Sequence, residues 1–176
     1  IMIRSKSSDQ LVFSILGMHR SGTSALTRIL NLCGLSTAKH LLAANAYNKT
    51  GYWEPKQITD FNDSVLHQLG RHWSDPKPLP TGWSSGEKFG SLTDQAADLL
   101  ESEFEHTGGI VLKDPRMTRL MPVWRGAVEK CGSEAICLIA YRNPLSVYQS
   151  LKTRDSIDFE HAMQLWLTYM LEAEAG

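Results

Sequence analysis

The sequence predicts a three-layer α/β/α domain built around a central parallel sheet, and three observations support this fold class. Short apolar runs at 11–16, 110–112 and 135–141 are rich in Ile, Val and Leu and do not alternate cleanly, as in strands buried on both faces. Segments with helical periodicity separate these runs, and strands that alternate with helices form parallel sheets. The length of 176 residues suits one domain with a sizeable core, so we expect residues 1–176 to form a single domain.

The helices are predicted from apolar stripes and from the residues at their ends. The predicted helices cover 25–33, 55–69, 91–105 and 120–131, and two more begin near 145 and 158. In the first helix the apolar stripe consists of Ala25, Leu26, Ile29, Leu30 and Cys33. Gly34 follows as a C-terminal cap, and Pro55 suits the first turn of the second helix. Ser91 with Asp94 resembles a capping box for the third helix.

One long segment, 71–90, lacks any periodicity. It holds three prolines, three glycines and two tryptophans, Trp73 and Trp83. An irregular segment of this length in a compact domain is often a lid or a binding loop. The two tryptophans could therefore cover a ligand, or they could pin the segment to the core.

Composition narrows the classes of partner. A formal net charge of −1 gives no bulk electrostatic reason to expect nucleic acid, and no apolar run is long enough to span a bilayer. The cysteines Cys33, Cys131 and Cys137 are odd in number and fall in apolar stretches, which predicts buried thiols and a cytoplasmic location. The histidines and cysteines show no paired ligand spacing, so no metal site is predicted.

The strongest local signal is the stretch Gly17-Met18-His19-Arg20-Ser21-Gly22-Thr23-Ser24, directly after the first strand. A loop that opens a helix turns backbone N–H groups and the positive helix end toward one point, which suits a phosphate or sulfate. Its glycine spacing is that of a Walker A loop, but Thr23 stands where an NTPase places lysine. Arg20 supplies positive charge instead. The alternative is a glycine-rich turn that binds nothing.

This loop resembles the 5′-phosphosulfate loop of sulfotransferases that use 3′-phosphoadenosine 5′-phosphosulfate (PAPS), particularly bacterial members and tyrosylprotein sulfotransferases. A second match is Arg142-Asn143-Pro144 followed by Ser150, which has the spacing of the family's 3′-phosphate motif. An arginine fork and a hydroxyl about two helical turns apart can converge on one phosphate. The resemblance implies that His19, Arg20, Ser21, Gly22, Thr23 and Ser24, together with Arg142 and Ser150, bind PAPS.

Two further motifs resemble catalytic segments of this family. Lys113-Asp114-Pro115-Arg116 resembles the motif whose lysine lies beside the transferring group, so Lys113 would stabilise developing charge. It could instead be a degenerate Walker B motif or a structural ion pair. Gly51-Tyr52-Trp53-Glu54 resembles the segment that supplies the acceptor base in some members, with His19 and Asp114 as rival bases. Glu54 would also be a good electrostatic cap for the helix after Pro55. Asn48 and Lys49 are candidates to line the same pocket.

The resemblance implies a P-loop NTPase-like fold and sulfuryl transfer from PAPS to a hydroxyl acceptor, with a carbohydrate or another small molecule as partner. Glu54, Lys113 and Arg20 are its implied catalytic residues. The family continues past the last helix into another strand and a basic loop, which residues 1–176 do not include. A P-loop kinase or NTPase, or a nucleotide-binding module without catalysis, are the alternatives.

Overall fold

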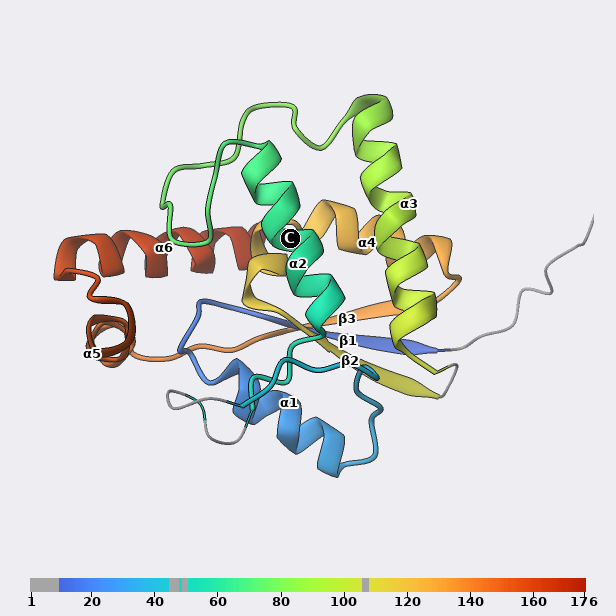
Figure 1. Ribbon diagram of the computed structural model, residues 1–176, viewed down its shortest axis with the longest axis horizontal. Coiled ribbons are helices and arrows are strands. Elements are labelled where there is room, and N and C mark those ends of the chain that lie inside the picture. Colours follow the sequence, from blue (N-terminus) through green and yellow to red (C-terminus); the bar gives the residue numbers. More distant parts are fainter. Residues whose placement is uncertain (1–9, 45–47, 49–50, 106–107) are drawn as a thin grey trace, which may run out of the picture.

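The computed structural model describes residues 10–44, 48, 51–105 and 108–176. Its sheet consists of β1 (Leu11–Leu16), β2 (Gly109–Lys113) and β3 (Glu134–Ile139). The strands are parallel in the order β2-β1-β3, so the central strand is the one that leads into the glycine-rich loop. The third strand ends two residues earlier than its apolar run predicts. This open parallel sheet, with helices on both faces, confirms an α/β fold (Figure 1).

The helices gather in three places around the sheet. Figure 1 shows α1 on one face, α2, α3 and α4 on the other, and α5 and α6 on the side where the strands end. The bounds are α1 (Thr23–Leu32), α2 (Lys56–Gln68), α3 (Gly86–Glu103), α4 (Met121–Lys130), α5 (Pro144–Asp155) and α6 (Phe159–Ala175), with a short 3-10 helix η1 (Pro115–Arg119) before α4. In the part of the chain described, no helix is long and apolar enough to cross a membrane.

Two apolar clusters hold these elements together. The main cluster fills the space between the sheet and α2–α4, where Leu112 and Trp124 are fully buried. The smaller cluster joins α5 and α6 to the loop after β1 and includes Met18, Leu151 and Tyr169. Each large apolar side chain buried in this way stabilises the fold by roughly 1.5–3 kcal/mol.

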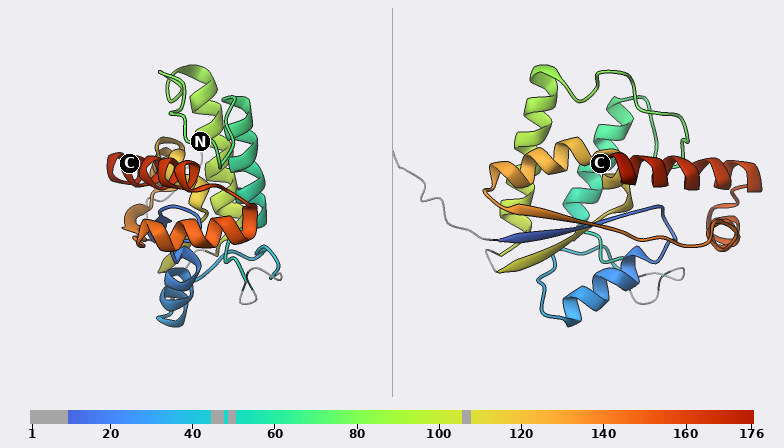
Figure 2. Two further views of the ribbon diagram at one scale, coloured as in Figure 1. Left: turned by 90° about the vertical axis from the view of Figure 1, so that its left-hand side faces the viewer. Right: turned by 180° about the vertical axis from the view of Figure 1, so that it is seen from behind.

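The predicted apolar stripe of α1 is wrong in part. The buried side chains of this helix are Thr23 and Thr27, whereas Ile29 and Leu32 are 57% and 69% exposed. Figure 2 shows from behind that α1 lies alone below the sheet, so no neighbouring helix covers its outer side. The small threonine side chains permit close packing against the strands, and this tertiary contact outweighs the apolar pattern.

The cysteines and the start of α3 also differ from prediction. Cys33 and Cys137 are exposed and Cys131 is partly buried, and all three thiols are free. Helix α3 begins at Gly86 with Ser85 at its N-cap, so Ser91 lies inside the helix and caps nothing. The added turn brings Phe89 against Trp83, with ring centroids 6.2 Å apart, and this packing extends the helix toward its N-terminus.

The irregular segment between α2 and α3 is pinned to the rest of the molecule. Its backbone carbonyls accept hydrogen bonds from side chains of η1 and α6, which leaves the segment little freedom to act as a lid. The Tyr169 hydroxyl donates to the Trp73 carbonyl (2.9 Å), and the Thr168 hydroxyl donates to the Pro76 carbonyl (3.0 Å). The Arg119 guanidinium donates to the carbonyls of Asp75 (2.7 Å) and Lys77 (2.6 Å). His161 Nε2 lies 2.6 Å from the Ser74 carbonyl. Of the two interpretations of this segment, the structure supports the pinned one.

Candidate functional site

The loop between β1 and α1 is shaped by close backbone packing. Gly17 has φ +129°, and a Cβ placed there would lie 2.7 Å from the Ala140 carbonyl oxygen, so only glycine fits. Its N–H donates to Thr118 Oγ1 at 2.9 Å, which ties the loop to η1. Arg20 and Gly22 then adopt left-handed φ values of +70° and +91°, and these turns lead directly into α1.

The N-terminus of α1 offers unpaired donors. Among the described residues, the backbone N–H groups of Gly22, Thr23 and Ser24 have no hydrogen-bond acceptor. The Ser24 hydroxyl donates to the Tyr52 carbonyl at 3.0 Å, and Thr23, at the position of the Walker lysine, is buried. Free N–H groups at the positive end of a helix form an anion-binding site.

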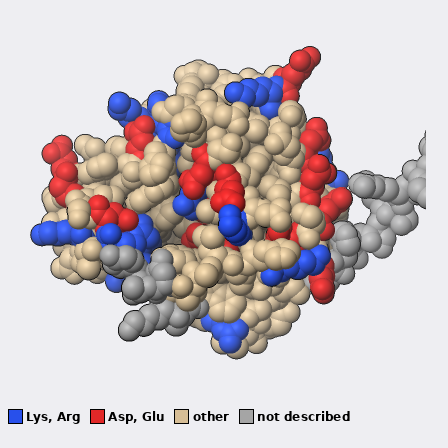
Figure 3. Space-filling view, viewed as in Figure 1, with Lys and Arg blue, Asp and Glu red and all other residues tan. Residues whose placement is uncertain are grey.

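A pocket of about 800 Å³ opens at this helix end and is strongly cationic. The charged side chains that line it are one carboxylate, Glu54, and five cations, Arg20, Arg28, Lys113, Arg142 and Arg154. Figure 3 shows Lys and Arg side chains, with Asp and Glu side chains among them, on the side where the strands end, so the excess of cations is a property of the pocket lining and not of the whole face. This imbalance favours an anion with several charges.

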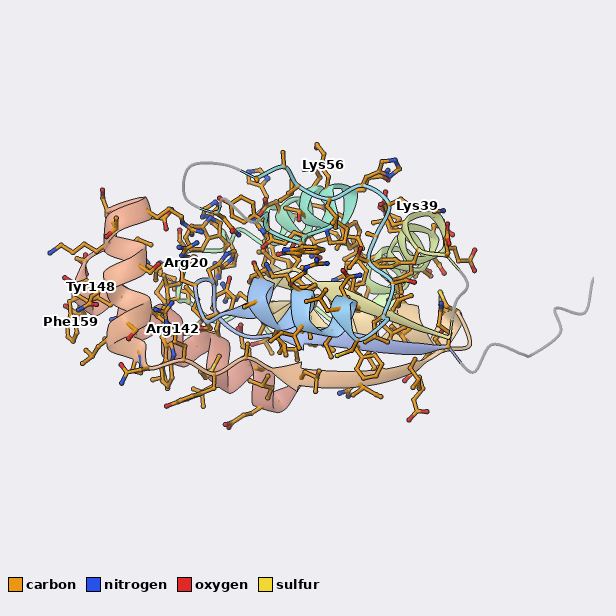
Figure 4. All side chains as sticks on the ribbon, turned by 90° about the horizontal axis from the view of Figure 1, so that it is seen from below. Arg20, Lys39, Lys56, Arg142, Tyr148 and Phe159 are labelled. Carbon is orange, nitrogen blue, oxygen red and sulfur yellow. The ribbon has the colours of Figure 1, made fainter. Side chains whose placement is uncertain are left out.

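Arg20, Arg142 and Ser150 meet on one side of the pocket. The Arg20 Nε donates to Ser150 Oγ at 2.7 Å, and Arg142 Nη1 donates to the Arg20 carbonyl at 2.8 Å. Figure 4 shows Arg20 and Arg142 close together beyond the strands. Burial lowers the pKa of Arg20, and the nearby Arg154 and Arg142 lower it further because like charges repel. Ser150 does not line the pocket itself and acts through Arg20.

Glu54 and Lys113 form a buried ion pair on the opposite side of the pocket. Lys113 also donates to Ser24 Oγ at 3.2 Å and to the Tyr52 carbonyl at 3.0 Å. Burial raises the pKa of Glu54, against the attraction of Lys113, and burial lowers the pKa of Lys113 in turn. Because the pKa of Glu54 is raised and that of Lys113 is lowered, protonating the Glu54 carboxylate costs less free energy than it would without these shifts. Among the described residues, no side chain caps α2 by a hydrogen bond, and the Glu54 carboxylate pairs with Lys113 just before the first turn of this helix.

The residues after Lys113 form a polar network behind the ion pair. Asp114 is fully buried and accepts hydrogen bonds from Asn62 (3.0 Å) and Arg116 (2.9 Å). Burial alone would lower the pKa of Arg116, but Asp114, Asp63 and Glu54 together raise it. Asp114 does not line the pocket, whereas Glu54 does, so the geometry favours Glu54 over Asp114 as the acceptor base. The network instead fixes Arg116, whose Nη1 lies 3.7 Å from Glu54 Oε2.

His19 also lines the pocket, but its ring is buried against aromatic side chains. The ring centroid is 4.6 Å from that of Trp73 and 6.0 Å from that of Tyr169. Burial, with Arg116, Arg154 and Lys113 nearby, lowers the pKa of His19 well below 6.5, which favours the neutral ring. Its Nε2 and the hydroxyl of Ser21 have no hydrogen-bond partner among the described residues. Unlike His19, Ser21 does not line the pocket.

Seven pocket residues were missed by sequence reasoning or received no role in the site from it: Ala25, Arg28, Ile29, Tyr52, Trp53, Pro115 and Arg154. Helical spacing could have found two of them. Arg154 follows Ser150 by four residues on α5, and Arg28 follows Ser24 by four on α1, which places each pair on one helix face. Asn48 lines the pocket as expected, whereas Lys49 lies outside the described residues.

No family model, curated protein or solved structure matches this chain. Within the described ranges, no three His, Cys, Asp or Glu side chains are grouped to hold a metal ion. The proposal for its function therefore rests on the geometry and chemistry of the pocket.

Proposed function

We propose that this chain is a sulfotransferase on a P-loop NTPase-like scaffold, which transfers a sulfuryl group from PAPS to a hydroxyl acceptor. The observation that carries the proposal is the combination of free N–H groups on α1 with a pocket rich in arginine. The cations lie on both sides of the loop, as a ligand with two separate anionic groups requires. A Walker A loop binds the β- and γ-phosphates of a triphosphate through its lysine, and Thr23 occupies that position here, which argues against a triphosphate ligand.

The two anionic groups of PAPS have separate places in this proposal. The 5′-phosphosulfate binds the N–H groups of Gly22, Thr23 and Ser24, and the 3′-phosphate binds Arg142. Ser150 orients Arg20 through the 2.7 Å hydrogen bond, so Arg20 lies between the two anionic groups. An anion there relieves the repulsion among Arg20, Arg142 and Arg154 that lowers the pKa of Arg20.

The transfer step uses the buried ion pair. The acceptor hydroxyl oxygen forms a bond to sulfur, while the bond from sulfur to the bridging oxygen of the 5′-phosphate breaks. Glu54 takes the proton of the acceptor, and Lys113 neutralises charge on the leaving oxygen. The products are the sulfated acceptor and 3′-phosphoadenosine 5′-phosphate. Because burial raises the pKa of Glu54, its carboxylate is more basic than an exposed one.

Calorimetry with two nucleotides tests the proposal. We expect 3′-phosphoadenosine 5′-phosphate to bind at least about tenfold more tightly than ATP with Mg²⁺, a difference of roughly 1.4 kcal/mol. Sulfur-labelled PAPS should then lose its label to an acceptor in a reaction that Glu54→Gln slows by about 10²–10⁴-fold. Tight, Mg²⁺-dependent binding of ATP with no binding of the 3′-phosphorylated nucleotide would instead indicate a kinase or NTPase. Binding without any turnover would indicate a module that only holds nucleotide.

A further inference from the structure

One wall of the pocket lies on the side of the central strand opposite to Arg142, to which the 3′-phosphate is assigned. The strand order β2-β1-β3 places Lys113, at the end of β2, and Arg142, after β3, on opposite sides of the central strand. Trp53 precedes Glu54 in the chain, and Arg28 lies on α1, which packs against β2. Trp53 and Arg28 therefore lie on the same side of the pocket as Glu54, the proposed base.

This wall combines an apolar surface with a positive charge for which the described residues supply no counter-ion. We call Ala25, Arg28, Ile29 and Trp53 the acceptor wall; all four line the pocket. The Arg28 guanidinium lies 5.0 Å from the centroid of the Trp53 ring, and its Nη1 donates to Asn31 Oδ1 at 2.6 Å. Within the described residues, no carboxylate forms an ion pair with Arg28, and its other N–H groups carry no hydrogen bond to protein.

Two further features indicate that the wall is built to receive a ligand. Ile29 lines the pocket and is 57% exposed, so its apolar side chain is accessible to a ligand there. Trp53 has φ +58°, a left-handed conformation that is a genuine outlier for a bulky residue and costs of order 1–3 kcal/mol. Strain of this kind persists where the surrounding structure imposes it, and here it holds the indole beside Glu54.

We infer that the acceptor wall binds an acidic carbohydrate, with the sugar ring on Trp53 and Ile29 and its carboxylate or sulfate on Arg28. A sugar ring has apolar C–H faces that pack on an indole, and hydroxyl groups at its rim that can approach Glu54. A simple phenol lacks the anionic group that would neutralise Arg28. The inference rests on the proposed function, because it assigns the acceptor of that same reaction.

Two sugars that differ in one group test this assignment. The probes are methyl β-D-glucuronide and methyl β-D-glucoside, which carry a carboxylate and a hydroxymethyl group at the same ring position. Their binding to protein loaded with 3′-phosphoadenosine 5′-phosphate is measured by NMR titration. We expect the glucuronide to bind about tenfold more tightly, since hydrogen bonds between charged partners are roughly twice as strong as neutral ones. Arg28→Gln should abolish this preference, and Arg28→Lys should retain part of it.

A matched control and the nucleotide affinity separate this inference from the proposed function. Arg125, an exposed arginine of α4, does not line the pocket, so Arg125→Gln should leave the preference for glucuronide unchanged. Arg28→Gln should change the affinity for the nucleotide by less than about twofold, well under the 1.4 kcal/mol that a tenfold change represents. Equal binding of the two sugars by the wild type, or an equal loss of nucleotide and sugar in Arg28→Gln, would overturn the inference while the proposed function stands. A wild type that binds no 3′-phosphorylated nucleotide would overturn both.

Discussion

At the scale of single residues, His19 shows how burial and charge together set a protonation state. Its ring lies between Trp73 and Tyr169, and Arg116, Arg154 and Lys113 are the charged groups that lower its pKa after burial itself. A protonated ring would lose the solvation of its charge and would be repelled by these cations. His19 therefore favours the folded state only while it is neutral.

This environment predicts that the fold loses stability in mild acid. Because the folded pKa of His19 lies well below 6.5, the unfolded chain binds a proton first as the pH falls. The stabilising contribution is fully present above about pH 6.5 and is lost as the pH falls toward the folded pKa. Replacing the ring by an apolar one of similar shape, in His19→Phe, should flatten this part of the stability curve. Urea midpoints measured between pH 7.5 and 5 provide the comparison.

The exposed His67 of α2 supplies the control. His67→Asn should leave the pH dependence of stability as it is in the wild type. The explanation fails if His19→Phe retains the full slope of the wild type over the same pH range. The slope would then belong to other groups of the chain.

At the scale of elements, the junction between β3 and α5 delivers the residues of the proposed 3′-phosphate site. Asn143 Oδ1 accepts from the Leu145 N–H at 2.9 Å and so caps α5, and Pro144 fits its first turn. Trp166 of α6 donates to the Arg142 carbonyl at 3.0 Å. The cap and this hydrogen bond fix the backbone of Arg142 at the pocket, and α5 carries Ser150 to Arg20.

From this junction we expect that substitutions of Arg142 weaken binding of the 3′-phosphate selectively. Arg142→Ala should weaken binding of 3′-phosphoadenosine 5′-phosphate by about 10- to 100-fold, since hydrogen bonds to charged groups contribute roughly 1.5–3 kcal/mol. Ser150→Ala should cost less, about 1 kcal/mol, because Ser150 acts through Arg20. Adenosine 5′-phosphosulfate lacks the 3′-phosphate and should bind Arg142→Ala nearly as it binds the wild type. If both nucleotides are weakened equally, Arg142 serves to brace the loop through the Arg20 carbonyl.

The elements that the sequence predicted well are those with strong local signals. The three strands were identifiable from continuous apolar runs, and Gly34 was identifiable as the residue that ends α1. Its N–H donates to the Asn31 carbonyl while the Leu35 N–H donates to the Leu30 carbonyl, which is the hydrogen-bond pattern of a glycine cap. The buried face of α1 was not predictable in the same way, because the contact with the sheet decides it and local periodicity does not.

The same distinction applies to the candidate site. The residues of the loop after β1, with Arg142 and Ser150, were candidates because their spacing along the chain is informative, and the structure brings Arg20, Arg142 and Ser150 into contact. Arg28 and Trp53 come from separate segments, and no local pattern predicts that they meet. The pairing of Glu54 with Lys113 is also a tertiary contact, although each residue was singled out by its own motif.

At the scale of the whole molecule, the two apolar clusters meet at Trp73. This side chain packs against both the main cluster under α2–α4 and the smaller cluster of α5 and α6. Its ring contacts His19, and the Arg154 guanidinium of α5 lies 5.4 Å from the ring centroid. Its carbonyl accepts from the Tyr169 hydroxyl of α6. Trp73 therefore couples the side of the pocket that carries Arg142 and Arg154 to the rest of the fold.

This position predicts that Trp73→Ala loosens one part of the molecule before the rest. The substitution should destabilise the protein by about 2–4 kcal/mol, somewhat below the usual range for a fully buried tryptophan because Trp73 is only half-buried. Hydrogen exchange should increase mainly in α5 and α6, since contiguous parts of a protein can open as separate units. Trp83, in the same segment, packs against the main cluster and, among the described residues, not against the smaller one, so Trp83→Ala should leave exchange in α5 and α6 unchanged. If Trp73→Ala instead accelerates exchange uniformly in every element, the clusters form one cooperative unit and Trp73 does not couple them.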